Sequence, residues 1–349
     1  MQSIRIGRHL IGEEQPCFII AEAGVNHNGD IDTAKNLVSA ARDCGASCVK
    51  FQTFKAEQLL ISNAPKAEYQ LKVTDPGETQ FEMLKKLELK EDDYEKLISH
   101  CEKEGILFLA TPYNVEDVDF LDELGVHAFK LSSIHAVEPW FAQYVAKKQK
   151  PIILATGMAT LSEIDETVRA VREIGHEDLI LLQCTTNYPS RIEDANVLAM
   201  RTLAESFGTL VGYSDHTQDD VACILAIALG AKIIEKHFTL NKSMPGPDQS
   251  TSADPREFQR LVVNIQSAEK GLGSKIKEPC DVEIINSLGM RRSIVAKCDI
   301  KVGQVISMDH LTFKRPANGI KPSRLGDVVG RVAKLSISAN HAISWSDFD

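Results

Sequence analysis

The 349-residue sequence lacks any run of about 20 apolar residues, the length that a membrane-spanning helix needs. It also lacks a CxxC pair, because its eight cysteines are scattered and several lie within apolar stretches. This spacing is typical of reduced cysteines in a protein core rather than of a disulfide framework. The opening stretch, MQSIRIGRHL, has no apolar segment after its basic residues and does not resemble a signal peptide. These absences predict a cytoplasmic protein that does not insert into a membrane.

A surplus of positive charge is missing as well. The formal net charge is −10, which argues against a surface dedicated to nucleic acid. A small anionic substrate is compatible with this charge, because a few lysines can set the local field inside a cleft. With 43% hydrophobic and 25% charged residues, the composition is that of an ordinary globular protein, long enough for one large and one small domain.

Short apolar runs alternate with helix-like segments through most of the chain. Their apolar character is continuous rather than alternating, which favours parallel strands covered on both faces. Eight such repeats over roughly 250 residues predict an α/β fold, a (β/α)8 TIM barrel. The alternative is an open doubly wound sheet, but no GxGxxG motif follows the first run, and the near-even repeats favour closure. The strand-like runs are residues 17–22, 47–53, 106–111, 127–132, 151–156, 179–184, 209–214 and 232–237.

Capping signals mark where helices begin. Thr160 and Glu163 form the pattern of a capping box ahead of a helix that ends near Gly175. Asp254 and Pro255 combine an N-cap residue with a proline at the first helical position. Both patterns predict helices in the places that a barrel requires.

The pattern changes near residue 272. Residues 273–290 are interpreted as a linker, and residues 291–349 contain short runs broken by Gly, Pro and Asn. The sequence therefore predicts a TIM-barrel domain over residues 1–272 and, after the linker, a small and mostly-β domain.

Three lysines interrupt apolar strand-like runs: Lys50, Lys130 and Lys236. Burying a lysine is costly unless an anion pairs with it. Each of them alone could extend to solvent or pair with a nearby carboxylate. Three in equivalent places, together with Ser and Thr hydroxyls, predict an anion site at the C-terminal ends of the strands, and phosphate suits such donors.

Two histidines end consecutive strand-like runs, so in a barrel they are neighbours. His216 and His237, with Glu22, Asp215 or Glu235 nearby, could hold a divalent metal that keeps positions open for substrate and water. A lone histidine at a strand end is more often a simple hydrogen-bonding group, and it is the pair that favours a metal.

A loop longer than a turn requires follows the last run. Residues 243–250, SMPGPDQS, are interpreted as a substrate-covering loop. Asp248 within it could bind substrate hydroxyls, or it could serve as a turn residue after Pro-Gly-Pro.

Several short segments occur together and in order: AEAGVNHNGD, VKFQTF, ATPY, ATGM, YSDHT, EKHFT, PGPD and KRPANG. They resemble the N-acetylneuraminate (sialic acid) synthase family, which includes legionaminate and pseudaminate synthases, over essentially the whole chain. The resemblance implies a TIM barrel with a C-terminal antifreeze-like (SAF) domain. It also implies condensation of phosphoenolpyruvate with N-acetylmannosamine or a related 2-acetamido or 2,4-diacetamido sugar, giving a nine-carbon ulosonic acid and phosphate.

The same resemblance implies roles for individual residues. His216 and His237 would hold the metal, with Mn²⁺ the expected ion and Mg²⁺ or Co²⁺ as alternatives, and the metal would polarise the sugar aldehyde. Arg315 would reach the sugar's N-acyl group in a partner subunit, which implies a domain-swapped homodimer. Phosphoenolpyruvate would be held by Lys50, Lys130, Ser133, Thr111 and Ser214, with Gln52 close by. The acceptor sugar would be engaged by Glu22, Tyr188 and Asp248.

Three positions depart from the family pattern. His135 stands where the family has an acid near the reacting carbons; a histidine can do acid–base work near neutral pH, or it could signal a changed substrate or an impaired reaction. Ala155 replaces a serine, and Thr186 stands where asparagine or serine is common, in the expected substrate site. We expect Glu22, Lys50, Lys130 and His135 to take part in catalysis.

Two alternatives stay open. One is a phosphoenolpyruvate-dependent synthase of the Kdo or heptulosonate type, which the SAF tail and the lack of a second Arg and Lys cluster disfavour. The other is a catalytically weak barrel that binds a sugar acid or regulates a glycan pathway. Its support comes from His135 and Ala155.

Overall fold

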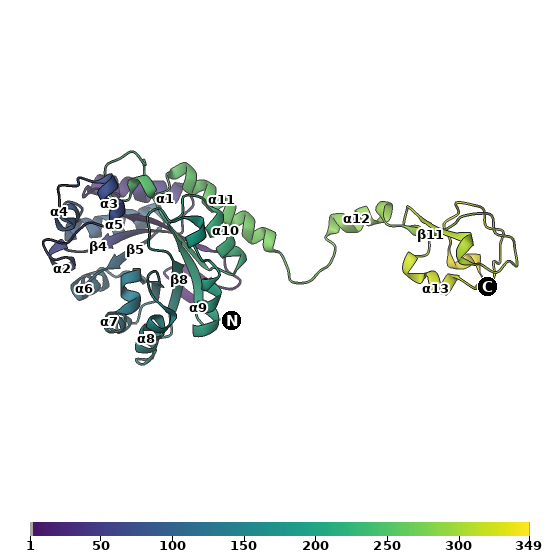
Figure 1. The fold of residues 1–349 in the computed structure, drawn as a ribbon, viewed down its shortest axis with the longest axis horizontal. Coiled ribbons are helices and arrows are strands. Elements are labelled where there is room, and N and C mark those ends of the chain that lie inside the picture. Colours follow the sequence, from purple (N-terminus) through teal and green to yellow (C-terminus); the bar gives the residue numbers. More distant parts are fainter. Residues whose placement is uncertain (1–2, 349) are drawn as a thin grey trace. The chain divides into compact units, whose positions relative to one another are not determined.

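The computed structural model describes residues 3–348 of the chain. Residues 1, 2 and 349, at the outer limits of the predicted domains, lie outside this description. The chain divides into two compact units, Met1–Gly273 and Ser274–Asp349, and each is described by itself. Figure 1 shows the elements of both units as a ribbon.

The first unit is a barrel of parallel strands. Hydrogen bonds join the strands in the order β5-β4-β3-β10-β9-β8-β7-β6, and the two end strands, β5 and β6, contact one another. Each predicted run overlaps one of these strands, so the TIM-barrel prediction is confirmed. The strands are β3 (Phe18–Gly24), β4 (Cys48–Thr53), β5 (Leu107–Pro112), β6 (Phe129–Leu131), β7 (Ile152–Ala155), β8 (Leu179–Cys184), β9 (Leu210–Asp215) and β10 (Ile233–His237).

Helices surround the strands (Figure 1). Thr160 Oγ1 accepts a hydrogen bond from Glu163 N, and Asp254 caps the last barrel helix, as their sequence patterns predict. The main helices are α1 (Ile31–Asp43), α5 (Glu91–Glu104), α6 (Val115–Glu123), α7 (Pro139–Ala146), α8 (Leu161–Arg172), α9 (Ala199–Phe207), α10 (Val221–Ala228) and α11 (Pro255–Leu272). The long β4–α5 connection adds three short ones, α2 (Ala56–Leu59), α3 (Glu68–Val73) and α4 (Gln80–Lys85).

Apolar side chains fill the lower part of the barrel. A hairpin of β1 (Ser3–Ile6) and β2 (His9–Gly12), absent from the sequence prediction, contributes Ile4, Ile6 and Ile11 to the cluster inside the strands. The other members come largely from the N-terminal parts of the strands, such as Phe18, Leu107 and Leu210. The interior is therefore filled at this end, which leaves the C-terminal ends of the strands for a site.

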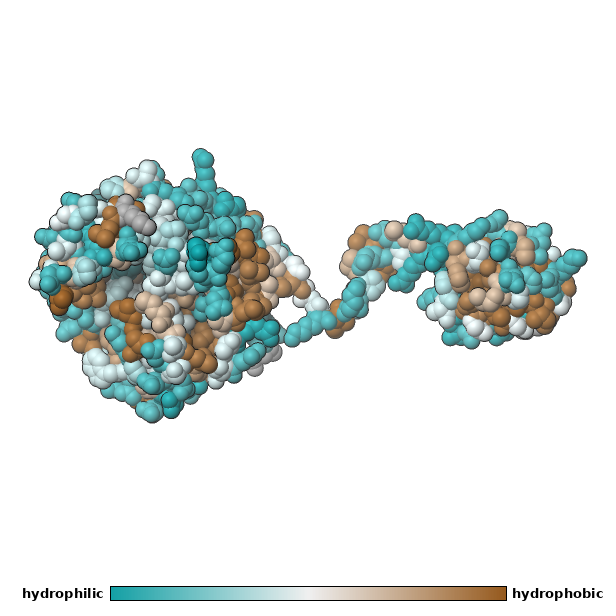
Figure 2. All heavy atoms as spheres, in the orientation of Figure 1, coloured by the Kyte–Doolittle hydropathy of each residue, from teal (hydrophilic) through white to brown (hydrophobic). Residues whose placement is uncertain are grey.

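The second unit begins with α12 (Asp281–Met290), a helix inside the predicted linker that keeps apolar side chains such as Ile285 and Leu288 exposed (Figure 2). Strands β11 (Ser293–Ala296) and β12 (Leu311–Lys314) pair antiparallel, and α13 (Leu325–Val328) follows. A separate small core contains Ile294, Ile306 and Ile343.

The eight cysteines are all free, and six of them are buried. Cys280 and Cys298 are exposed, so the interpretation of the cysteines as core thiols does not hold for these two. Over residues 3–348, no helix has both the length and the apolar character needed to cross a membrane.

Candidate active site

A pocket of about 700 Å³ opens at the C-terminal ends of the barrel strands. A TIM barrel carries its functional groups here because the loops that follow the strands meet at this end. The predicted site residues of the barrel line the pocket, with the exceptions of His135 and Lys236. These residues are Glu22, Lys50, Gln52, Thr111, Lys130, Ser133, Thr186, Tyr188, Ser214, His216, His237 and Asp248.

Two carboxylates and two lysines form one buried cluster in this pocket. Lys50 Nζ lies 2.7 Å from Glu22 Oε2, and the two residues are register partners on β4 and β3. Lys130 Nζ lies 3.4 Å from Glu235 Oε1, which also accepts a hydrogen bond from Ser214 Oγ at 3.1 Å. Since β6 and β10 are not neighbours in the sheet, Lys130 and Glu235 reach across the barrel to meet.

The cluster separates the pKa values of its two carboxyl groups. Burial raises the pKa of Glu22 above its ordinary value, against the attraction of Lys50. Burial opposes ionisation of Glu235 as well, but the ammonium groups of Lys130 and Lys50 bring the pKa of that carboxyl below its ordinary value. One carboxyl that readily holds a proton, beside one that stays ionised, suits acid–base chemistry.

Hydroxyl groups gather beside the lysines. Ser133 Oγ accepts a hydrogen bond from Gly157 N at 2.9 Å, and a Cβ on Gly157 would come within 2.8 Å of that oxygen. The side-chain oxygens of Ser132 and Thr186 are buried without a hydrogen-bond partner among the described residues. Ala155 lines the same pocket and offers no donor. Unused hydroxyls next to two lysines suit an anion such as phosphate, which accepts many hydrogen bonds.

The imidazoles of His216 and His237 lie side by side, with ring centroids 5.3 Å apart. His216 Nδ1 donates to the Thr185 carbonyl oxygen at 2.7 Å, so in the neutral ring the lone pair is on Nε2. His237 Nδ1 is buried without a hydrogen-bond partner among the described residues. Burial holds the pKa of His237 well below its ordinary value, so its ring is neutral.

Imidazoles with free lone pairs fit a divalent transition metal. Within residues 3–348, no group of three or more His, Cys, Asp and Glu side chains converges as a metal site. His216 and His237 could hold an ion as a pair, with its other positions left to substrate and water.

Asp248 enters the pocket from the loop after β10. Its Oδ2 lies 3.9 Å from His237 Nδ1, and burial raises the pKa of its carboxyl to about 6. The side chain makes no capping hydrogen bond, so it faces the pocket instead of closing the turn. The loop is held from behind, because Gln249 Nε2 donates to Asn26 O and Asn26 Nδ2 donates to Ser252 Oγ, both at 2.9 Å.

Two pocket tyrosines were missed by the sequence reasoning. Tyr69, from α3, packs with its ring centroid 5.0 Å from that of Tyr188, which in turn lies 4.2 Å from the His216 ring. Tyr113 donates from its hydroxyl to Gln52 Oε1 at 3.3 Å. Tyr69 lies in an insertion with weak local patterning, whereas Tyr113 closes the ATPY segment and could have been found there.

His135 does not take the place expected for a catalytic acid. Its side chain is fully buried in the short helix Ser133–Val137 and does not line the pocket. Its Nε2 donates to the Pro112 carbonyl oxygen at 3.2 Å, its Nδ1 lies 2.8 Å from Glu138 Oε2, and its ring stacks on Phe141 at 4.3 Å. These contacts make His135 part of the packing that connects the end of β5 to the segment after β6.

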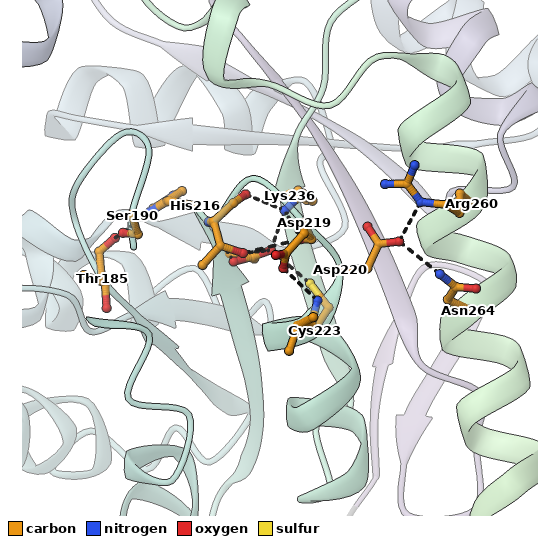
Figure 3. Close-up of polar contacts among 12 residues, drawn as sticks. Thr185, Ser190, His216, Asp219, Asp220, Cys223, Lys236, Arg260 and Asn264 are labelled. Carbon is orange, nitrogen blue, oxygen red and sulfur yellow. Dashed lines mark hydrogen bonds and ion pairs between the residues drawn. The ribbon is translucent and has the colours of Figure 1, made fainter. Parts of the chain in front are cut away.

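Lys236 is also not part of the anion site. Its side chain points away from the pocket and pairs with Asp215, and its Nζ donates to the carbonyl oxygens of Thr217 at 2.7 Å and Asp219 at 3.0 Å. Figure 3 shows Lys236 directed toward the loop that contains Asp219, with Cys223 of α10 nearby. The expectation of three anion-binding lysines is therefore wrong for this one, because successive strand residues face opposite sides of the sheet.

Arg315 lies in the second unit, exposed directly after β12. Its approach to a partner's pocket stays a prediction.

Comparison with known proteins defines the class. The chain belongs to the NeuB family, whose profile matches residues 37–277, and a SAF domain profile matches residues 291–349, which confirms the predicted family. The chain is 43% identical over 342 residues to the N,N'-diacetyllegionaminic acid synthase of Legionella pneumophila, over 97% of this chain and 96% of that protein.

Two further relatives support the same class. The N,N'-diacetyllegionaminic acid synthase of Campylobacter jejuni is 45% identical over 328 residues, covering 93% of this chain and 98% of that protein. The crystal structure of the N-acetylneuraminic acid synthetase of Leptospira borgpetersenii, in complex with citrate, matches with a TM-score of 0.73 at 33% identity, over 82% of this chain and 95% of that chain. The names of these relatives indicate a synthase of the sialic-acid type.

Proposed function

We propose that this protein condenses phosphoenolpyruvate with a 2,4-diacetamido sugar to give a nine-carbon acid of the legionaminate type and phosphate. The main observation in support of this proposal is that three features share one pocket. They are a cluster of lysines and hydroxyls suited to phosphate, a pair of imidazoles that can bind a metal, and the carboxylate of Asp248. The acceptor class rests on the two legionaminic acid synthases that are 43% and 45% identical to this chain.

The reaction forms a bond between C3 of phosphoenolpyruvate and the aldehyde carbon of the sugar. The aldehyde oxygen gains a proton, water adds at C2, and phosphate leaves with its bridging oxygen. A divalent metal, with Mn²⁺ the expected ion, would supply Lewis-acid polarisation of the aldehyde. Lys50, Lys130 and Ser133 hold the phosphoenolpyruvate and so orient its C3 toward the acceptor.

The two carboxyl groups of the cluster have different roles, charge stabilisation and proton transfer. Glu235 stays ionised beside Lys130, and its negative charge stabilises the positive charge that develops at C2. Glu22, whose pKa is raised, carries the proton that one step releases and another takes up. Asp248 and Tyr188 position the acceptor hydroxyls, and Arg315 of a second subunit completes the site in a domain-swapped homodimer.

The pocket argues against the Kdo or heptulosonate type of synthase. Among the described residues that line it, the lysines are Lys50 and Lys130 and there is no arginine, so a sugar phosphate would find no second basic cluster. The regulatory alternative keeps the support of Ala155, which lines the pocket, whereas His135 lies outside the lining.

The test is phosphate release from phosphoenolpyruvate, measured with Mn²⁺ or with EDTA. The acceptor panel is N-acetylmannosamine, its 6-phosphate and a 2,4-diacetamido-6-deoxymannose. We expect metal-dependent release with the diacetamido sugar, and loss of that release in His216→Ala. Release with N-acetylmannosamine alone would move the acceptor assignment, and release with none of them would overturn the synthase proposal in favour of a binding role.

A further inference from the structure

The ion pair of Asp215 and Lys236 lies directly behind the two imidazoles. Asp215 and Lys236 are register partners on the neighbouring strands β9 and β10, and both side chains are buried. The next residue along the chain is His216, directly after β9, or His237, the last residue of β10. Because successive side chains point to opposite faces of a sheet, the ion pair faces the helix layer while the imidazoles face the pocket.

The ion pair is fully hydrogen-bonded. Lys236 Nζ donates to Asp215 Oδ2 and to the carbonyl oxygens of Thr217 and Asp219, which uses all three of its hydrogens. Asp215 Oδ1 accepts from Thr217 N at 2.9 Å, and its Oδ2 accepts from Cys223 Sγ at 3.2 Å. The loop after β9 is thus wrapped around one ammonium group (Figure 3).

His216 is the first residue of this loop, between Asp215 and Thr217, and it is also fixed from its other side. Its carbonyl oxygen accepts from Ser190 N at 2.8 Å, and its Nδ1 donates to Thr185 O at 2.7 Å. These contacts hold His216 against the loop after β8. The contacts of Lys236 hold the same residue against β10, the strand that carries His237.

We propose that Asp215 and Lys236 form a positioning pair, which fixes the separation and orientation of the His216 and His237 rings and thereby the affinity of the metal site. This inference rests on the proposed function, since that function assigns the metal to these imidazoles. Without the ammonium group, the carboxylate and two loop carbonyls lose their common partner, and the backbone on both sides of His216 is released.

The test compares metal affinity with stability in variants of the pair and in a control variant of the same loop. Lys236→Met removes the ammonium group, and the double variant Asp215→Asn with Lys236→Met removes both charges, which relieves the unpaired carboxylate. Asp220→Ala is the matched control: Asp220 lies in the same loop, directly before α10, and accepts from Arg260 and Asn264 at 3.0 Å each, but it does not touch the pair (Figure 3).

Binding of Mn²⁺ is measured by calorimetry, and the visible spectrum of bound Co²⁺ reports the ligand geometry. Melting temperature is recorded for each variant. We expect the Kd for Mn²⁺ to rise by about 10- to 100-fold in Lys236→Met and in the double variant, with a changed Co²⁺ spectrum. The double variant should recover part of the melting temperature without recovering affinity, and Lys236→Arg should recover part of the affinity. Asp220→Ala should melt earlier and bind Mn²⁺ as the wild type does.

The outcomes separate the inference from the proposed function. If the wild type binds Mn²⁺ through His216 and the double variant binds it equally well, the positioning pair is refuted and the metal site stands. The same holds if Asp220→Ala loses as much affinity as Lys236→Met, because general loosening of the loop would then explain the loss. If the wild type does not bind Mn²⁺ at all, the metal site fails and the inference fails with it.

Discussion

Strand β10 carries charged groups on both faces, and the two faces differ in how completely the hydrogen bonds of those groups are satisfied. On the pocket face, Glu235 Oε2 is buried without a hydrogen-bond partner among the described residues, and Lys130 lies 3.4 Å from the same carboxylate. On the helix face, Lys236 and Asp215 have a partner for every hydrogen and for both oxygens. Glu235 and Lys236, adjacent on β10, therefore belong to two kinds of cluster. We call the pocket cluster unfinished, because it contains a buried polar atom without a partner, and the Asp215–Lys236 cluster finished, because its hydrogen bonds are complete.

The contrast has a physical meaning. An unpaired polar atom in a buried place costs free energy, so a protein retains it where a ligand supplies the missing partner. A completed network leaves nothing for a ligand to satisfy, and its contribution is to hold backbone in place. Unused hydrogen-bonding capacity separates Lys130, a candidate substrate ligand, from Lys236, which sequence alone places in the same group.

Breaking the unfinished cluster gives the largest expected effect. Lys130→Met should lower kcat/KM for phosphoenolpyruvate by about 10³-fold or more, because it removes an anion-binding cation and leaves the buried Glu235 carboxylate with the more distant ammonium group of Lys50, at 4.0 Å. Steady-state phosphate release measures the change. The control is Lys150→Met, which removes a half-buried lysine paired with Asp122 at the opposite end of the barrel. An equal loss in both variants would contradict the assignment of Lys130 to the substrate.

A smaller effect should follow from crowding the hydroxyl groups. In Gly157→Ala the new methyl group would meet Thr186 Oγ1 and lie 2.8 Å from Ser133 Oγ, so both hydroxyls must move. We expect KM for phosphoenolpyruvate to rise by about 10- to 100-fold, since displacement by a fraction of an ångström already costs orientation. Gly271→Ala on α11, where nothing lies within 4 Å, should leave KM unchanged. A normal KM in Gly157→Ala would place the phosphate elsewhere.

The pH dependence of acceptor binding tests whether the carboxylate of Asp248, on the pocket side, binds the sugar. The pKa of Asp248 is raised to about 6 by burial, so its carboxyl gains a proton as pH falls through that value and loses an acceptor for sugar hydroxyls. KM for the sugar should rise severalfold from pH 7.5 to pH 5.5, where about three-quarters of the group is protonated. In Asp248→Asn, KM should be high and nearly independent of pH over this range. A wild-type profile that is equally flat would exclude Asp248 as a sugar ligand.

The smallest effect on catalysis is expected at His135, because both of its ring nitrogens have partners within the protein. His135→Phe keeps the stacking on Phe141 but leaves the Pro112 carbonyl without its donor. The free energy of unfolding should fall by about 1–3 kcal/mol. The value of kcat should change by less than about threefold, because the ring does not reach the pocket. Denaturant unfolding and initial rates measure the two quantities, and a loss of kcat without loss of stability would restore the catalytic interpretation.

Much of this architecture could be predicted from the sequence, and the misses have definite causes. Continuous apolar runs specify the strands, and the polar residues at their ends specify the pocket. The sequence also contained the information that Lys236 faces away from the pocket. Glu235 and His237 flank it on the same strand, and three successive side chains cannot all face one side of a sheet. The β1–β2 hairpin and the α3 insertion with Tyr69 could not be predicted in this way, because each is too short for a periodic pattern to stand out.

The junction of β5 and β6 gives the barrel a mechanical property. Among the described residues, the ladder of strand hydrogen bonds runs from β5 around the barrel to β6 and does not join them, so side chains such as His135 close the ring there. Thr111 stands on one side of this junction and Lys130 and Ser133 on the other, all facing one pocket. An anion bound by residues on both sides would link β5 to β6, which no strand hydrogen bonds join among the described residues. Ligand binding would then stiffen the whole ring and slow amide exchange first along these two strands.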